Sequence, residues 1–347
     1  MNKVARLPKV DVRNGTIEMA HGAGGRTMTK LVEDLFIRHF DNELLRQQND
    51  QAMFAVPAGR MVMATDAHVI SPIFFPGGDI GSLSVHGTIN DVAMAGATPL
   101  YLAAAFVLEE GFPLIDLERI VMSMAQAAKA AGVPIVTGDT KVVERGNADG
   151  IYITTTGVGV VAEGVSISAD LARPGDKVLL SGAIGNHGMA ILSCRENLEF
   201  ATTIQSDSAA LHTLVQSMLA SSNAIKCLRD ATRGGLAAVL NEWAQQSAVG
   251  FHIDEATIPI HTEVASACEL LGLDPLYVAN EGKLVAVVAA DEADNVLAAM
   301  RTHPLGHEAS IIGEVTGDAH HFVSMHTRYG GTRMVDWLAA EQLPRIC

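Results

Sequence analysis

The sequence predicts a two-domain protein of the α/β or α+β class. The chain has 347 residues, whereas a domain usually contains about 150. Hydrophobic residues make up 48% of the chain and charged residues 18%, which is enough apolar material for a sizeable core. Segments with strand patterning alternate with segments of helical patterning along both halves of the chain.

The first half shows this alternation clearly. Helices are predicted over 27–36 and over 116–132, where apolar residues recur at helical spacing and Gly132 provides a stop. Strands are predicted where apolar and β-branched residues dominate, at 60–66, 101–110, 133–139 and 151–161.

A domain boundary is predicted after residue 168, because an "RPGD" turn at 173–176 follows a polar link and precedes a new apolar strand. In the second half, strands are expected at 177–182 and 283–290. Helices are expected at 208–222, 234–246 and 292–303. The last element is expected to end near Trp337, which leaves 338–347 as a mobile tail.

Composition excludes several classes of protein. With 24 Lys+Arg against 39 Asp+Glu, the net charge of -15 argues against binding to nucleic acids or to anionic membranes. The first residues carry no apolar run of the signal-peptide kind, and the most apolar stretch, 92–108, contains Pro99 and is short for a membrane span. Four scattered cysteines without a CxxC pair indicate free thiols, a cytoplasmic location and no structural zinc.

A glycine-rich stretch, "HGAGG" at 21–25, precedes the first helix. Glycines at Gly22, Gly24 and Gly25 allow backbone N–H groups to converge on an anion. The stretch matches neither the Walker pattern nor GxGxxG, so a phosphate cradle and a plain glycine-rich turn both remain open.

Four aspartates occupy comparable positions near apolar segments: Asp66, Asp91, Asp139 and Asp230. For any one of them alone, a helix cap or a turn residue is the better explanation. Together they favour a site for Mg²⁺ and nucleotide phosphates, because carboxylates at strand ends meet where α/β folds bind ligands.

Lys141 and Glu281 are candidates for catalysis. A lysine beside bound phosphates neutralises developing charge or acts as a base, and a glutamate just before a strand serves as a base or a metal ligand. A solvated ion pair is the ordinary alternative for either residue. The 13 histidines form no Ser–His–Asp pattern.

Six motifs occur in order: "HGAGG", "TD", "GTINDVAMAGA", "GDTKV", "RDATRGG" and "ANEGK". They resemble the ATP-dependent superfamily of aminoimidazole ribonucleotide synthetase, selenophosphate synthetase and thiamin monophosphate kinase. The selenophosphate synthetases carry a cysteine or selenocysteine near the first motif that this chain lacks. With "FFPGGDIG" and the final "PRIC", the sequence is most similar to the HypE family of hydrogenase maturation factors, over residues 17–347, which leaves 1–16 as an extension.

The resemblance implies an architecture. It implies an ATP-binding and dimerisation domain at 17–168, whose mixed sheets pair into a barrel-like homodimer interface. It also implies a C-terminal α/β sandwich at 169–337 and a tail that carries Cys347.

It also implies an activity. ATP and Mg²⁺ would serve to dehydrate a carbamoyl group (thiocarboxamide) on Cys347 to an S-cyano group, the cyanide source for [NiFe]-hydrogenase iron. HypF would be the carbamoyl donor and the HypC–HypD complex the cyanide acceptor.

The implied catalytic residues are Cys347, Glu281 and Lys141, with the base left open between the last two. The four aspartates would bind the metal, and the nucleotide would contact Gly22, Gly24, Gly25, Asp66, Asn90, Asp91, Thr140, Thr232 and Gly234. Two other functions stay open: a small-molecule ATP-dependent synthetase or kinase of the same superfamily, and a non-catalytic scaffold that presents the tail.

Overall fold

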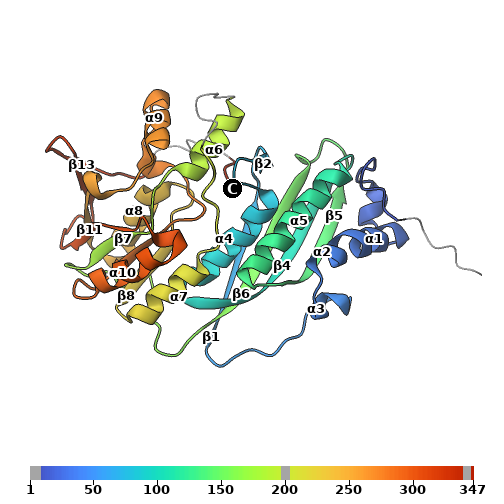
Figure 1. The fold of residues 1–347 in the computed structure, drawn as a ribbon, viewed down its shortest axis with the longest axis horizontal. Coiled ribbons are helices and arrows are strands. Elements are labelled where there is room, and N and C mark those ends of the chain that lie inside the picture. The colour runs from blue at the N-terminus through green and yellow to red at the C-terminus, as the bar shows by residue number, and fades with distance from the viewer. Residues whose placement is uncertain (1–8, 197–203, 339–344) are drawn as a thin grey trace, which may run out of the picture.

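The computed structural model describes residues 9–196, 204–338 and 345–347. Two α/β units lie side by side along the long axis of the molecule, one built on a four-stranded sheet and the other on a seven-stranded sheet (Figure 1). The predicted two-domain mixed α/β class is therefore confirmed. The division after residue 168 falls between the two sheets and stays a prediction.

The N-terminal sheet has the order β1-β6-β4-β5. Its β1/β6 and β6/β4 pairs are antiparallel, whereas β4/β5 is parallel. The strands are β1 (Arg60–His68), β4 (Ala97–Glu109), β5 (Ile135–Val143) and β6 (Ile151–Val161), and a separate ribbon pairs β2 (Phe74–Phe75) with β3 (Gly78–Asp79). This sheet is open within the chain, since no closed barrel forms in it.

Helices α4 (Ile80–Met94) and α5 (Leu114–Ala131) cover one face of this sheet (Figure 1). Helix α5 buries the apolar stripe that its sequence predicts, and it ends at Gly132, whose φ of 69° is left-handed. Helix α4 is buried almost all round, and its sequence accordingly lacks the amphipathic period of a surface helix. For this reason the sequence does not predict it as a helix. It packs on the N-terminal sheet and also against α7 (His212–Ser221) and β8 (Ile225–Asp230) of the second unit.

The first helices pack at the β5 side of the sheet. The helix predicted over 27–36 is observed, and it runs as α1 (Arg26–Leu31), a π-helical turn at Val32–Ile37, and α2 (Arg38–Phe40), followed by the short α3 (Glu43–Arg46). Residues of this segment and of β4 and β5 line an apolar pocket of about 110 Å³.

The opposite face of the N-terminal sheet carries exposed apolar side chains. Met61 and Met63 are 51% and 72% exposed. Because strand side chains alternate between faces, the same face receives Thr65 and Ala67 of β1. We call this the open face.

The C-terminal sheet has the order β13-β12-β9-β11-β7-β10-β8 and is antiparallel except for the β12/β9 pair. Its strands are β7 (Lys177–Leu180), β8 (Ile225–Asp230), β9 (Gly250–Asp254), β10 (Leu284–Val288), β11 (Ser310–Thr316), β12 (Val323–His326) and β13 (Thr332–Met334).

Helices cover both faces of this sheet. Apolar side chains of α8 (Gly235–Ser247) pack on one face, and those of α7 (His212–Ser221) and α10 (Ala293–Thr302) pack on the other. Strand β10 is therefore buried at every position, which explains its unbroken apolar run. Helices α6 (Asn186–Arg195) and α9 (Thr262–Leu271) form a smaller cluster together.

No helix in the described part of the chain is both long enough and apolar enough to cross a bilayer. All four cysteines are described, and all four are free thiols.

Candidate active site

Residues 345–347 dock against the segment that follows β1. The backbone N–H of Val69 donates to the carbonyl oxygen of Cys347 at 3.0 Å, and the N–H of Ser71 donates to that of Arg345 at 3.3 Å. The side chain of Ile346 is only 2% exposed and belongs to the N-terminal core. Residues 339–344 of the predicted tail and 1–8 of the predicted extension lie outside the described residues. The two backbone hydrogen bonds and the buried side chain of Ile346 hold the last three residues at a defined site.

Acidic side chains from both units gather near Cys347. Asp66 lies on β1, Asp91 on α4, Asp230 at the end of β8, and Glu281 just before β10. Helix α4 joins them because it packs on both β1 and β8. A Cβ on Gly87 would lie 3.1 Å from His68 Nε2, so glycine lets the helix approach the strand closely.

The charges of this cluster repel one another in a buried place. Burial and, after it, the neighbouring carboxylates raise the pKa of Glu281 well above its usual range. The same two causes raise the pKa of Asp91 to about 7. Burial raises the pKa of Asp230 to about 6, with Asp66 adding to the effect. A bound cation would remove this repulsion, and clusters of this kind mark functional sites.

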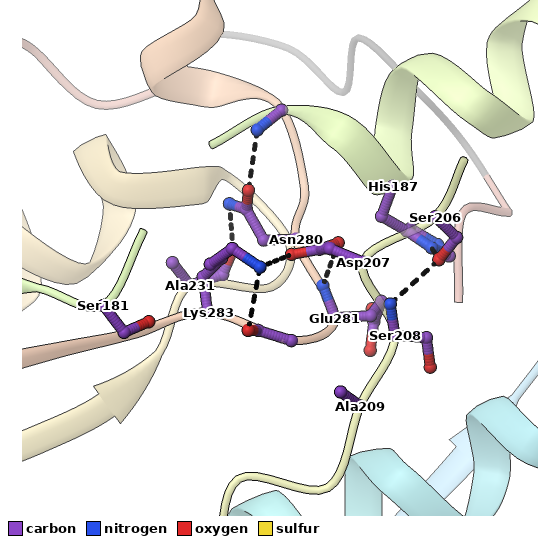
Figure 2. Close-up of polar contacts among 12 residues, drawn as sticks. Ser181, His187, Ser206, Asp207, Ser208, Ala209, Ala231, Asn280, Glu281 and Lys283 are labelled. Carbon is purple, nitrogen blue, oxygen red and sulfur yellow. Dashed lines mark hydrogen bonds and ion pairs between the residues drawn. The ribbon is translucent and has the colours of Figure 1, made fainter. Parts of the chain in front are cut away.

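Glu281 is held by its backbone while its carboxyl stays unpaired. Its N–H donates to Asp207 Oδ1 at 3.1 Å (Figure 2). Its side chain is buried, and Oε1 has no hydrogen-bond partner among the described residues. Asp207 in turn lies 3.3 Å from Lys283 Nζ, the ion pair that anchors this turn (Figure 2). A buried carboxyl oxygen without a partner is suited to meet a polar group of a ligand.

The side chain of Asn90 is hydrogen-bonded to backbone groups of the second unit. Its Nδ2 donates to the carbonyl oxygens of Ala209 at 3.0 Å and of Glu281 at 3.3 Å, and its Oδ1 accepts from Leu211 N–H at 2.7 Å. The amide is thus occupied by backbone groups, and it ties α4 to the turn that carries Glu281. The contact of Asn90 with the nucleotide stays a prediction.

The thiol of Cys347 is kept protonated in the docked position. Burial, and then the charge of Glu281, raise its pKa to about 12, although Arg233 acts in the opposite direction. Since the thiolate is the nucleophilic form, the docked sulfur is a poor nucleophile.

Asp139 and Lys141 lie elsewhere. We predicted that Asp139 ends a strand, but β5 continues to Val143, and the two side chains form an ion pair with each other. In register, Asp66 aligns with Thr155, Ala104 and Gly138, and Thr155 faces α4 by donating to Ser84 O at 2.8 Å.

Asp139 is one residue further along β5 and faces the opposite way, onto the open face. It is also separated from Asp66 by three strand spacings, about 14 Å. The structure therefore does not bring Asp139 together with the other three aspartates within one chain, and a metal site that uses all four stays a prediction. Three of them, Asp66, Asp91 and Asp230, gather with Glu281.

The glycine-rich stretch lies beside β5 rather than beside Asp66. A Cβ on Gly22 would lie 2.8 Å from the backbone nitrogen of Val142, so only glycine fits there. Gly24 and Gly25 border open space. Thr140 is buried on the same strand. Thr232 and Gly234 belong to the second unit, where they form the turn that follows Asp230 at the end of β8. A 2.9 Å hydrogen bond from Gly235 N–H to Thr232 O closes this turn.

As it stands, the described part of the chain contains no group of three His, Cys, Asp or Glu side chains that could hold a metal ion by themselves. The cluster nevertheless suits Mg²⁺. This ion usually takes one or two carboxylates and completes its octahedron with phosphate oxygens and water. Mutually repelling carboxyls are the expected state of such ligands before phosphates arrive.

Several residues at the site were not predicted. Arg233, which belongs to the "RDATRGG" motif, acts on the pKa of both Cys347 and His68. His68 is buried with its Nε2 3.3 Å from Asp66 Oδ2, and its position two residues after Asp66 was the only signal for it. Asp207 and His187 carry no motif at all, and only the fold places them here.

Comparisons with known proteins agree with this architecture. Residues 48–161 match the N-terminal domain model of AIR synthase related proteins, and residues 173–326 match the C-terminal domain model. The chain is 68% identical to a carbamoyl dehydratase HypE of Cupriavidus necator over 339 residues, 97% of each chain. It is 65% identical to the Azotobacter vinelandii protein of the same name, which covers 98% of this chain and all of that one.

Solved structures give the same result. A HypE in complex with ATP superposes with a TM-score of 0.92 at 48% identity, covering 95% of this chain and 99% of that one. A HypE–HypF complex gives 0.79 at 51% identity, covering 89% and 99%. A thiamine-monophosphate kinase of Stenotrophomonas maltophilia shares only the fold, with a TM-score of 0.66 at 21% identity and coverage of 86% and 95%. The chain therefore belongs to the HypE family of carbamoyl dehydratases within the AIR synthase related proteins.

Proposed function

We propose that this chain uses ATP and Mg²⁺ to dehydrate a carbamoyl group carried on Cys347 to an S-cyano group, which supplies cyanide for [NiFe]-hydrogenase iron. The observation that carries the proposal is the docking of Cys347 beside Glu281 in the cluster that contains Asp66 and Asp230. A small-molecule kinase or synthetase would have no reason to hold its own last cysteine there.

The reaction converts R–S–C(=O)–NH₂ and ATP into R–S–C≡N, ADP and phosphate. ATP supplies the activation, since phosphorylation of the amide oxygen turns it into a good leaving group. The amide nitrogen must lose both protons as the C–O bond breaks. Phosphoryl transfer itself asks mainly for positioning and for charge stabilisation.

Glu281 is the residue of this chain best placed to take a proton. It neighbours Cys347, its Oε1 has no partner among the described residues, and its pKa is raised well above the usual range. A carboxylate with a raised pKa is a stronger base near neutral pH than an exposed one. Asp66, Asp91 and Asp230 would share the Mg²⁺ with the phosphates.

Lys141 and Asp139 belong to the site only across a dimer, in our proposal. Both side chains lie on the open face. The exposed Met61 and Met63 of the same face suit burial against a second copy of the chain. Pairing two open faces would form the barrel-like homodimer interface, with Lys141 at the phosphates of one of the two sites. The predicted contacts of the nucleotide with Gly22–Gly25 and Thr140 stay predictions, because Thr140 lies on the opposite face of β5 from Asp139 and Lys141.

Mixing two inactive variants separates a site within one chain from a site across the dimer. Glu281→Gln and Lys141→Ala should each stall at the thiocarboxamide. If Lys141 acts on the partner's site, mixed dimers contain one site with both native residues and regain activity. If mixed dimers stay inactive while both variants still dimerise, the arrangement across the dimer is wrong.

Loading and delivery require the tail to leave this site. The docked thiol has a pKa of about 12, so it is not the nucleophile that accepts a carbamoyl group. We therefore propose that HypF loads the released tail and that HypC–HypD takes the cyanide from it. A solved HypE–HypF complex among the structural relatives supports the first partner.

The decisive experiment incubates the carbamoylated protein with Mg-ATP alone and weighs the C-terminal peptide. Loss of one water from the Cys347 peptide supports the proposal. The Cys347→Ala variant should bind ATP and give no product. A chain without residues 345–347 that still turns over a small substrate would favour a small-molecule enzyme, and partner binding without ATP consumption would favour a scaffold.

A further inference from the structure

The docked tail forms a short antiparallel pair with the segment after β1. Val69 pairs with Cys347, and Ser71 pairs with Arg345, through the two backbone bonds already described. Among the described residues, the intervening carbonyl, that of Ile346, makes no backbone hydrogen bond to this segment. It meets His187 instead, whose Nε2 lies 2.7 Å from Ile346 O.

We propose that His187 is a tail-positioning residue, which fixes the sulfur of Cys347 beside Glu281 by donating a hydrogen bond to the carbonyl oxygen of Ile346. This inference rests on the proposed function for its purpose, though the contact itself does not. The ligand of this site is a C-terminal peptide with a small aliphatic residue before the cysteine, because the Ile346 side chain is buried next to the same contact.

The hydrogen bonds around His187 define one tautomer. The carbonyl of Ile346 can only accept, so Nε2 carries the proton. Nδ1 lies 2.7 Å from Ser206 Oγ and accepts from that hydroxyl, and Ser206 Oγ accepts from Ser208 N–H at 3.1 Å (Figure 2). Both ring nitrogens are thus used, and the imidazole is aimed at the tail.

The surroundings keep the ring neutral and still. His187 is fully buried, which lowers its pKa, and Phe75 packs edge-on with ring centroids 5.6 Å apart. When the tail leaves, the Nε2–H loses its partner in a buried place. Because an unsatisfied buried donor is costly, the histidine favours the docked tail.

The segment 206–208, which contacts His187, also positions Glu281. Ser206 bonds to His187, while the next residue, Asp207, accepts from the N–H of Glu281 (Figure 2). A Cβ on Gly282 would lie 1.8 Å from the carbonyl oxygen of Asp207, so the segment 206–208 is in close contact with the turn that carries Glu281. Tail and base are therefore held by adjacent residues, and the contact of His187 sets the distance between them.

The test measures alkylation of Cys347 in the full-length protein without nucleotide, by mass spectrometry of the C-terminal peptide. Iodoacetamide should react faster with the released tail, because the docked Cys347 is only partly exposed. His187→Leu, which fills the space but cannot donate, should raise the alkylation rate roughly tenfold, equivalent to about 1.4 kcal/mol of docking free energy. His187→Gln keeps a donor and should return the rate close to that of the native chain.

A second measurement separates positioning from a general structural effect. In a single turnover of carbamoylated protein, His187→Leu should lower the dehydration rate in proportion to the docked fraction, while the KM for ATP stays unchanged. Unchanged alkylation in a folded His187→Leu variant overturns the proposal, as does failure of His187→Gln to restore protection. If His187→Leu does not fold, Ser206→Ala should raise alkylation about threefold through a misaligned ring, and no change there overturns the proposal too.

If the proposed function is wrong, the alkylation result differs from the one expected if the role of His187 is wrong. Alkylation needs neither ATP nor a carbamoyl group, so tail docking through His187 would still be detected in a protein that produced no S-cyano cysteine. Conversely, normal dehydration with unprotected Cys347 would keep the proposed function and remove His187 from it.

Discussion

Replacing Asp91 with asparagine should stabilise the protein without ligand and at the same time weaken Mg-ATP binding. Asp91 lies in a cluster with Asp66 and Asp230, and burial plus these charges raise its pKa from 3.8 to about 7. The folded pKa lies above the unfolded one, so the fold holds the proton more tightly than the unfolded chain does. The resulting stability is fully present below pH 3.8 and is lost as pH rises through about 7.

The magnitude follows from the shift. Each pKa unit is worth about 1.4 kcal/mol, so a rise from 3.8 to about 7 corresponds to about 4 kcal/mol. Asp91 is partly exposed, and it shares its repulsion with Asp230, so the effect on the whole protein is smaller. We expect Asp91→Asn to raise the free energy of unfolding by about 1–2 kcal/mol at pH 8, with little change at pH 4.

Urea denaturation with a metal chelator, at pH 4, 6 and 8, tests this directly. Calorimetry should show Mg-ATP affinity reduced at least about tenfold in the same variant, by loss of a metal ligand. Asp176→Asn is the matched control, because Asp176 is also buried but pairs with Lys226 at 2.7 Å. That change should lower stability by about 3 kcal/mol. If Asp91→Asn destabilises like the control, Asp91 is a structural residue and not part of a cation site.

Three further changes test other parts of the structure. Gly235→Ala should lower stability by about 2 kcal/mol or more, because φ is +60° and the new Cβ would lie 2.5 Å from Leu276 O; an unchanged melting temperature would contradict this close packing. Ile346→Ala should weaken tail docking about thirtyfold, from about 2 kcal/mol of lost burial, and should leave the urea midpoint unchanged; equal alkylation of Cys347 would refute it. Met63→Asp should convert the proposed dimer to monomers in analytical ultracentrifugation, and an unaltered mass would remove the open face from the interface.

Local patterns predicted most of the fold because most elements have an unmistakable period. Helix α5 has an amphipathic stripe and a glycine stop, and β6 has a β-branched run. Helix α4 was missed because it is buried between the two units and has no polar face. Its position, which joins Asp91 to β1 and β8, depends on contacts that no local pattern records.

The site was predicted in part for a related reason. A motif identifies residues with reactive chemistry, and it does so for Asp66, Asp230, Glu281 and Cys347. It does not say which face of a strand they occupy. Asp139 illustrates this limit: the strand ends four residues later than expected, at Val143, so an end position becomes a mid-strand position, and alternation then points its carboxylate away from Asp66. His187 had no motif because its partner is a backbone carbonyl, which any sequence provides.

The unpaired carboxyl of Glu281 explains how the site could tell a loaded tail from an empty one. Charge does not distinguish them, since a thiol with a pKa of about 12 and a carbamoyl thioester are both neutral at pH 7. Hydrogen bonding distinguishes the two tails. The empty tail leaves Glu281 Oε1 without a partner among the described residues, whereas the NH₂ of a carbamoyl group can donate a hydrogen bond to it. The loaded tail should therefore dock more tightly than the thiol. Comparing protease protection of the two C-terminal peptides in full-length protein would show this, and equal protection would mean that Glu281 does not meet the amide nitrogen.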